Sequence, residues 1–287
     1  MDAGRSQSSR HRFPPALDGH YAVVDGRVQT RSLEAHIVDH CNLTCAECCS
    51  LSPLLPRWTV TPAAFARDLS YAVRLLQPRV FKLVGGEPLL HPEVVELAQL
   101  ARQMQVAPII SLTTNGFLLP RMRDAFWQSL DALTISRYPE PQLSDEAIAT
   151  IEAQARRFGV QLNWKQQDAF VVMDRPARCD DEAETTAIYD ACWLRERCHL
   201  MRAGRFYTCT RPPHLQTLQA SRAGGDGPVD FGGDGIVLGE GDAGLAALVA
   251  YLGRARPLEA CAHCFGGNAR LVPHRLLGRD ELVRARR

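Results

Sequence analysis

The chain has 287 residues, 23% of them charged, and a formal net charge of +1. This balance excludes the basic footprint typical of nucleic-acid binding and gives no electrostatic attraction to an anionic membrane. No apolar run approaches the roughly 20 residues of a membrane helix, and the polar N-terminus lacks the apolar segment of a secretory signal. We therefore expect a cytoplasmic protein with no nucleic-acid partner and no membrane partner.

From about Leu33 to Trp164, short apolar runs alternate with helical patterns. In the first helical pattern Thr61 is a suitable N-cap, Pro62 occupies the first helical position and Pro78 ends the helix. The predicted strands are 32–38, 80–84, 108–114, 130–137 and 160–164, and the predicted helices are 61–77, 91–104, 122–130 and 144–158. This alternation predicts about five βαβ units, hence an α/β fold with an open parallel sheet or an incomplete barrel.

The alternating pattern breaks after Trp164. We expect residues 1–31 to be an N-terminal extension and 32–173 the α/β core. The rest divides into an acidic, strandless linker, a small cysteine-rich C-terminal module and a basic tail, at 174–189, 190–270 and 271–287. Within the module a short strand is predicted at 235–238 and a helix at 242–252, whereas 223–241 is a Gly/Asp-rich loop. The last residues, 279–287, are expected to form a solvated, frayed end.

The segment His40–Cys49, HCNLTCAECC, holds four of the ten cysteines. A cytosolic protein keeps its thiols reduced, so this cluster indicates metal or redox chemistry rather than disulfides. Cys41, Cys45 and Cys48 follow the first strand, at the sheet edge where parallel folds bind ligands. Three thiolates on one loop can hold an iron–sulfur cluster and leave one iron open to a small molecule. A zinc loop is the alternative, but Cys49 adjoins Cys48 and is poorly placed as a fourth ligand.

Polar residues also follow the next three predicted strands. Two glycines at a strand end let the backbone approach a ligand closely, and a neighbouring glutamate can hold an ammonium group. Because parallel strands end at one edge, these residues are expected to share one site. The candidates are Gly85, Gly86, Glu87, Pro88, Thr114, Asn115, Ser136 and Arg137.

The C-x3-C-x2-C loop followed by Gly-Gly-Glu-Pro after the second strand resembles the radical S-adenosylmethionine (radical SAM) superfamily, over about 33–164. The resemblance implies a partial (β/α)6 TIM-like barrel with a catalytic four-iron four-sulfur cluster on Cys41, Cys45 and Cys48. SAM would bind the open iron, and one electron would cleave it to methionine and a 5′-deoxyadenosyl radical that abstracts hydrogen from the substrate. The electron would come from a reductant such as flavodoxin or ferredoxin.

The same resemblance assigns roles to the strand ends. The stretch 85–88 would contact the methionyl amino group, Ser136 and Arg137 would lie near the ribose and carboxylate, and Thr114 and Asn115 complete the cofactor-binding set. Glu47 departs from the family pattern, in which the residue before the third cysteine is commonly aromatic. The usual adenine contact at this position is therefore left without an assignment.

The C-terminal cysteines resemble the Twitch module of this superfamily, a shortened relative of the SPASM domain. The resemblance implies a second, auxiliary four-iron cluster, and Cys192 and Cys198 compete for one of its four positions. The candidate ligands are Cys192, Cys198, Cys209, Cys261 and Cys264. A zinc ribbon is the alternative, because thiol pairs on loops also hold zinc. Cys49 and Cys179 are expected to be non-ligands.

The residues around these motifs resemble a subgroup associated with sugar-modifying, capsule and antibiotic pathways. This implies a small substrate, namely a sugar, an aminocyclitol or a nucleoside-like metabolite. We expect oxidation of a carbinol, slightly favoured because an auxiliary cluster can accept an electron, or redox-neutral dehydration, epimerisation or decarboxylation. For epimerisation Cys179 and Tyr207 are candidate hydrogen donors, and no histidine is assigned as a proton donor.

Two other hypotheses for the function of the protein stay open at this point. A peptide-modifying enzyme of the same superfamily is less favoured, because the residues before the first strand are too few for a leader-binding domain. An iron–sulfur or zinc protein without catalysis is less favoured still, since a pure binder has no use for an open iron.

Overall fold

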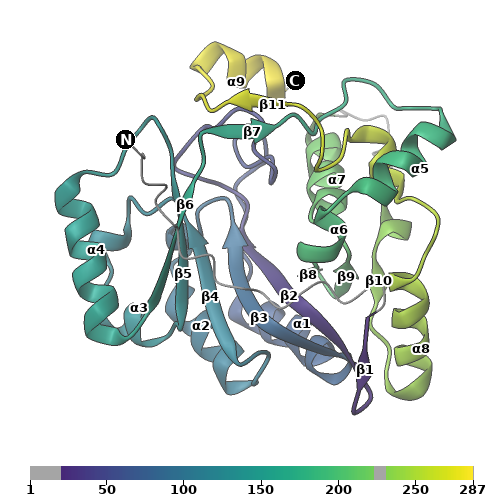
Figure 1. Cartoon of the computed structure of the whole chain (residues 1–287), viewed down its shortest axis with the longest axis horizontal. Helices are drawn as coiled ribbons and strands as arrows, with labels where there is room; N and C mark the ends of the chain where they lie inside the picture. The colour runs from purple at the N-terminus through teal and green to yellow at the C-terminus, as the bar shows by residue number, and fades with distance from the viewer. Residues whose placement is uncertain (1–20, 223–230, 287) are drawn as a thin grey trace, which may run out of the picture.

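The computed structural model describes residues 21–222 and 231–286, and within them an open sheet forms the centre of the molecule (Figure 1). Six neighbouring strands of this sheet run parallel, in the order β8-β2-β3-β4-β5-β6. They are β2 (Arg27–Val38), β3 (Leu76–Gly85), β4 (Ile109–Thr114), β5 (Ala132–Arg137), β6 (Gln161–Gln166) and β8 (Leu200–Arg202). The predicted α/β class with a mostly parallel sheet is confirmed, and no strand pairing among the described residues closes the sheet into a barrel.

Short antiparallel strands extend this sheet. They are β1 (Val23–Val24) on β2, β9 (Arg205–Tyr207) on β8, and β10 (Ile236–Val237) on β9. A separate two-stranded sheet pairs β7 (Ala169–Val171) with β11 (Leu271–Pro273). In Figure 1 this small sheet lies across the carboxyl ends of the parallel strands. The C-terminal part of the chain therefore returns to the edge where the first cysteines lie.

Four helices pack along the parallel strands (Figure 1). They are α1 (Pro62–Leu75), α2 (Val94–Gln103), α3 (Asp124–Gln128) and α4 (Asp145–Phe158). Local capping explains two of them: Thr61 and Ser144 accept from the backbone N–H three residues ahead, which satisfies an otherwise unpaired donor. Their apolar faces bury one core against the strands, with Leu69, Phe81 and Leu133 among its fully enclosed side chains.

Two strands begin earlier than predicted. β2 starts at Arg27 rather than Ser32, and β3 at Leu76 rather than Val80. The proline at position 78 disfavours helical geometry in the residue before it, so the chain becomes extended directly after Leu75 and pairs with the start of β2.

The module contains α5 (Glu182–Ala191), α6 (Leu194–Arg197), α7 (Arg211–Arg222) and α8 (Gly241–Leu252). Most of α5 lies in the segment 174–189, which we predicted to be an acidic, strandless linker and for which we expected no helix. Asp181 caps the helix by accepting from Ala183 and Glu184, and acidic residues in a first turn are favoured by the helix dipole. The predicted strand at 235–238 and helix at 242–252 correspond to β10 and α8, whereas 223–230 lie outside the described residues.

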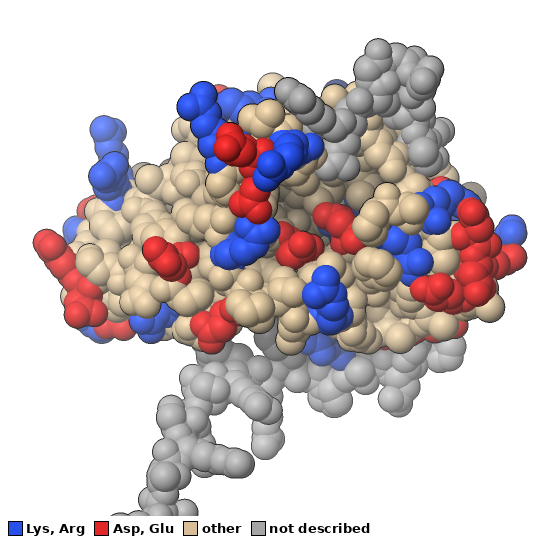
Figure 2. Space-filling model, turned by 90° about the horizontal axis from the view of Figure 1, so that it is seen from above, with Lys and Arg blue, Asp and Glu red and all other residues tan. Residues whose placement is uncertain are grey.

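The basic tail is also more ordered than predicted. It forms β11 and the helix α9 (Arg279–Arg286), whose Arg286 guanidinium donates to the Pro53 carbonyl. Short 3-10 turns occur at Pro88–Leu90, Leu119–Arg121, Gly232–Asp234 and Glu259–His263. None of the helices described is long and apolar enough to cross a membrane. Figure 2 shows acidic and basic residues interspersed over the face that carries α9.

Candidate iron–sulfur active site

The first cysteine loop, residues 40–49, leaves the carboxyl end of β2. Its thiols lie close enough together to interact electrostatically: Cys41 acts on Cys45, and Cys45 acts on Cys48. Burial raises the pKa of Cys41 to about 11 and that of Cys45 and Cys48 to about 12. Such thiols are protonated at neutral pH, so a metal centre that binds them must displace protons.

A strap formed by residues 274–277 holds this loop in place. The Ala46 N–H donates to the Arg275 carbonyl at 2.9 Å, and the Leu277 N–H donates to the Thr44 carbonyl at 2.8 Å. Within the loop Glu47 has a positive φ of 58°, a strained conformation for a residue with a side chain and one that is often found at functional sites. The loop conformation is therefore fixed by a segment more than two hundred residues later in the sequence.

A buried ion pair anchors the start of the loop. The Asp39 carboxylate, fully enclosed, accepts from both terminal nitrogens of Arg202 at 2.7 Å. This pair joins the end of β2 to β8, since Arg202 is the last residue of that strand. A bidentate pair of this kind fixes geometry more than it adds stability.

The two glycines of the Gly-Gly-Glu-Pro segment have a packing role that the sequence did not indicate. A Cβ on Gly85 would lie 2.3 Å from the Val38 carbonyl oxygen, and one on Gly86 would lie 2.2 Å from that of His40. The Gly86 and Glu87 N–H groups donate to these same two carbonyls, each at 3.0 Å. The close approach seen here is thus to the backbone that leads into Cys41, where we had expected an approach to a ligand.

Glu87 is completely buried, and its carboxylate already has three protein donors. They are the Thr114 hydroxyl at 2.7 Å, the Asn115 N–H at 2.8 Å and the Leu89 N–H at 3.0 Å. Burial raises the pKa of Glu87 to about 7, against the opposing effect of these donors. The predicted residues Glu87 and Thr114 are brought together, and they join the ends of β3 and β4.

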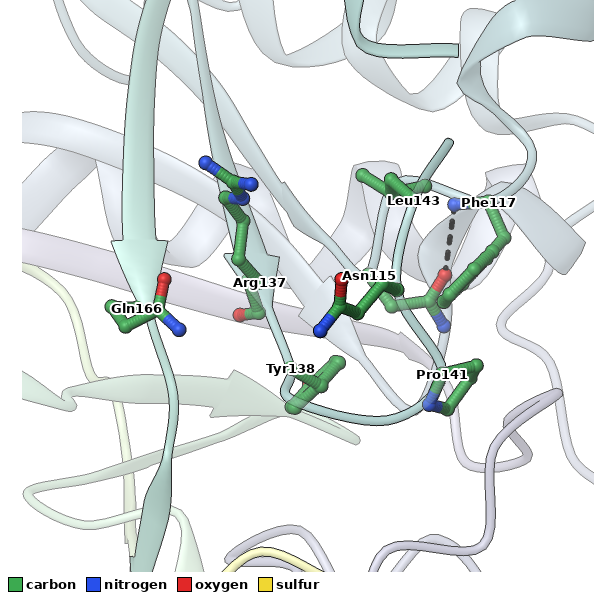
Figure 3. Close-up of a pocket in the computed structure, with 9 residues that line it drawn as sticks. Asn115, Phe117, Arg137, Tyr138, Pro141, Leu143 and Gln166 are labelled. Carbon is green, nitrogen blue, oxygen red and sulfur yellow. Dashed lines mark hydrogen bonds between the residues drawn. The ribbon is translucent and has the colours of Figure 1, made fainter. Parts of the chain in front are cut away.

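A polar pocket opens at the ends of β4, β5 and β6, and three predicted residues line it: Asn115, Ser136 and Arg137 (Figure 3). Asn115 links the pocket to the first cysteine loop, because its Nδ2 donates to Asn42 Oδ1 at 2.6 Å and lies 3.8 Å from Cys41 Sγ. Its Oδ1 accepts from the Phe117 N–H at 3.2 Å, the dashed contact of Figure 3. The pocket lining does not include Thr114 or Gly85–Pro88.

Sequence patterns did not indicate three aromatic residues near the first cysteine loop: Tyr138, His274, and Phe170, whose ring contacts the other two. His274 Nε2 lies 3.2 Å from Cys45 Sγ, and the His274 ring stacks on Tyr138 with a centroid distance of 4.7 Å. Burial raises the pKa of the Tyr138 hydroxyl, and electrostatic interactions with Cys41, Cys45 and Cys48 raise it further. Tyr138 directly follows the predicted Arg137 and could have been included. Nothing in the sequence near His274 indicates its position, because the strap alone places it there.

The second cysteine group surrounds one cavity, which we call the auxiliary cavity. Its lining includes all four thiols Cys192, Cys209, Cys261 and Cys264. Cys198 is not part of this lining, and the charges that act on its thiol include those of Glu34 and Lys82, on β2 and β3, as well as that of Cys209. The geometry therefore favours Cys192 over Cys198. The two candidate hydrogen donors, Cys179 and Tyr207, line neither pocket.

The surroundings of these thiols fit an iron–sulfur cluster. Backbone N–H groups donate to three of the sulfurs: Gly267 to Cys192 at 3.2 Å, Gly266 to Cys264 at 3.3 Å, and Arg211 to Cys209 at 3.5 Å. Hydrogen bonds to sulfur are one of the means by which proteins set the reduction potential of such clusters. Within the described ranges, no three His, Cys, Asp or Glu side chains are placed to hold a single metal ion.

The thiols of the first cysteine loop also have backbone N–H donors, as expected for ligands of an iron–sulfur cluster. The Leu43 N–H donates to Cys41 Sγ at 3.4 Å, and Cys48 has backbone donors at Ser50 and Ser52. Cys41, Cys45 and Cys48 are three free thiols on one loop, which matches a cluster with one iron left open.

Comparison with known proteins gives partial matches. A GTP 3′,8-cyclase of Mycobacterium marinum is 36% identical over 137 residues, which cover 46% of this chain and 38% of that protein. A GTP 3′,8-cyclase of Microcystis aeruginosa is 32% identical over 101 residues, 34% of this chain and 31% of that protein. The chain thus spans about a third of the length of these curated relatives. No family model matches the chain.

Among solved structures, BtrN in complex with AdoMet and 2-DOIA is similar with a TM-score of 0.47 and 10% sequence identity, over 84% of this chain and 94% of that one. Methylornithine synthase (PylB) has a TM-score of 0.36 at 12% identity, over 52% of this chain and 45% of that one. In its sequence relatives, its three-cysteine loop and the Gly-Gly-Glu-Pro segment joined to that loop, the chain is similar to enzymes of the radical SAM superfamily.

Proposed function

We propose that this protein is a cytoplasmic radical SAM enzyme that abstracts hydrogen from a sugar, an aminocyclitol or a nucleoside-like metabolite, and that oxidation of a carbinol is its favoured outcome. The observation that carries the proposal is the pairing of two cysteine sites, a three-thiol loop at the sheet edge and a four-thiol cavity in the module. A flavodoxin or ferredoxin is the proposed reductant.

The residues of the chain divide the work between them. Cys41, Cys45 and Cys48 would hold the first cluster, and the pocket lined by Asn115, Ser136 and Arg137 is proposed to receive SAM. A cluster held there would supply the one electron that cleavage of SAM to methionine and a hydrogen-abstracting 5′-deoxyadenosyl radical requires. Tyr138 stacks on both Phe170 and His274, and His274 contacts Cys45, so we propose that these rings limit the access of water to the loop.

The auxiliary cavity supports oxidation because of the electron count. When a carbinol becomes a ketone, the hydrogen on carbon goes to 5′-deoxyadenosine and the hydroxyl proton goes to a base or water. One electron remains, and it needs an acceptor near the substrate. Four thiols around one cavity offer a site for such an acceptor, whereas redox-neutral dehydration, epimerisation or decarboxylation needs none.

The relatives support a nucleoside-like substrate, because those proteins are named for a reaction of GTP. The short matched length leaves the substrate to experiment. GTP, aminocyclitols and sugar alcohols are therefore the first compounds to compare.

The test is iron and sulfide per chain on anaerobically reconstituted protein, beside a Cys41/Cys45/Cys48→Ala variant. We expect about eight irons in the native chain and about four in the variant. With SAM and dithionite, only the native chain should form 5′-deoxyadenosine, and the product of the true substrate should have lost two hydrogens. About four irons in the native chain and none in the variant would remove the support for oxidation. A lack of SAM cleavage by the loaded native chain would contradict enzyme function altogether.

A further inference from the structure

Arg211, the first residue of α7, lies between the two cysteine sites. Its side chain is only 3% exposed, and it belongs to the lining of the auxiliary cavity. One terminal nitrogen, Nη1, donates to the Cys49 carbonyl of the first cysteine loop at 3.1 Å, and the other forms an ion pair with Asp174. The guanidinium thus contacts one site directly while it forms part of the wall of the other.

One polar group of the Arg211 side chain has no hydrogen-bond partner among the described residues. This group is the Nε–H, which is buried. A buried guanidinium N–H without an acceptor is costly unless a ligand supplies one. The backbone N–H of the same residue already donates to Cys209 Sγ, and the positive charge interacts with Cys209 and Cys264. Sulfur in the auxiliary cavity is therefore a candidate acceptor for the free donor.

We propose that Arg211 is a positioning residue for the auxiliary cluster: its Nε–H donates to a sulfur of that cluster, and its buried positive charge raises the cluster's reduction potential. Reduction adds one negative charge to the cavity, and a buried cation close by stabilises that charge more than water-screened charges do. A higher potential lets the cluster accept the electron that remains after hydrogen abstraction. This inference rests on the proposed function.

Asp174 makes the sign of the effect testable. Its carboxylate is 41% exposed and pairs with Arg211, so it partly cancels the positive charge that the auxiliary cavity experiences. Loss of the guanidinium charge and loss of the carboxylate charge should therefore shift the potential in opposite directions. General damage to the module would shift both variants in the same direction.

The experiment is an anaerobic redox titration followed by EPR, in the Cys41/Cys45/Cys48→Ala background so that the auxiliary cluster alone reports. At a fixed poise near the midpoint we expect Arg211→Gln to lower the ratio of reduced to oxidised cluster by about tenfold, and Asp174→Asn to raise it. Arg195→Gln is the matched control. Arg195 also lines the cavity and is paired, with Asp190 and the Tyr189 carbonyl, but its side chain is 31% exposed. Water therefore screens its charge, and its loss should change the ratio little.

An unchanged ratio in Arg211→Gln, or shifts of the same sign in both variants, would overturn the inference. If Arg211→Gln fails to load the cluster, Asp174→Asn decides alone: a raised ratio supports the inference and an unchanged ratio contradicts it. Failure of the proposed function is distinguishable: absence of the auxiliary cluster leaves no iron to titrate in the parent variant, and a lack of SAM cleavage by the loaded native chain leaves the titration of the auxiliary cluster unaffected.

Discussion

At the scale of single residues, the carboxylate of Glu87 makes the stability of the fold depend on pH. Burial raises its pKa from 4.5 to about 7, so the folded state binds this proton more tightly than the unfolded state does. The resulting stabilisation is full below the unfolded pKa and is lost as the pH rises through the folded one. Between pH 4.5 and 7 the loss amounts to about 3 kcal/mol.

We therefore expect Glu87→Gln to flatten this part of the stability profile. The measurement is denaturant unfolding of the cluster-free, reduced protein from pH 4 to pH 8. Glu96→Gln, which changes an exposed carboxylate on α2, is the control and should keep the wild-type slope. Equal slopes in wild type and Glu87→Gln would show that the buried carboxyl does not titrate differently on folding.

A substitution at Gly86 tests the backbone contact between the Gly-Gly-Glu-Pro segment and the cysteine loop. A methyl group there would meet the His40 carbonyl oxygen at 2.2 Å, so Gly86→Ala must push the two backbones apart. We expect the free energy of unfolding to fall by roughly 3 kcal/mol, with loss of the first cluster's iron. Gly233→Ala is the control, since its Cβ would have no neighbour within 4 Å. Equal iron content in both variants would remove the packing role.

Measurements of iron content can also distinguish Cys192 from Cys198 as the ligand of the auxiliary cluster. Cys192 lines the auxiliary cavity and Cys198 does not. Cys192→Ala should cost the module most of its iron, whereas Cys198→Ala should retain about eight irons per chain. The reverse outcome would reassign the ligand.

At the scale of elements, the strap and α9 can be separated by truncation. The strap residues 274–277 pair with the cysteine loop, whereas α9 buries none of its residues. A chain that ends at Pro273 should lose first-cluster iron and unfold at lower denaturant. A chain that ends at Leu277 keeps the strap, and its iron content should be close to that of the full chain. If both truncations keep the first cluster, the strap is dispensable for the loop.

Local signals explain which elements could be predicted. Alternating apolar runs, the N-caps Thr61 and Ser144, and Gly159 with its φ of 70° mark α1 and α4 almost to the residue. The helix α5 was missed because its acidic first turn resembles a solvated linker in composition. What stabilises α5 is the Asp181 cap, which composition alone does not reveal.

At the scale of the whole molecule, the parallel order of the strands was predictable, and with it the edge where the polar residues gather. The contacts between distant segments were not. The Asp39–Arg202 pair, the orphan Nε–H of Arg211 and the approach of His274 to Cys45 each join residues more than a hundred and fifty positions apart, or depend on such a join. No local pattern encodes such contacts, because they follow from how the module folds back on the sheet.

The strap has a consequence for the order in which the site is built. A ribosome releases the cysteine loop long before residues 274–277 exist, so the nascent sheet edge is open on the side that the strap later covers. Until residues 274–277 have been made, the loop lacks the hydrogen bonds that Ala46 and Thr44 form with Arg275 and Leu277. The strap can therefore fix the loop only after all the strands of the parallel sheet have been synthesised.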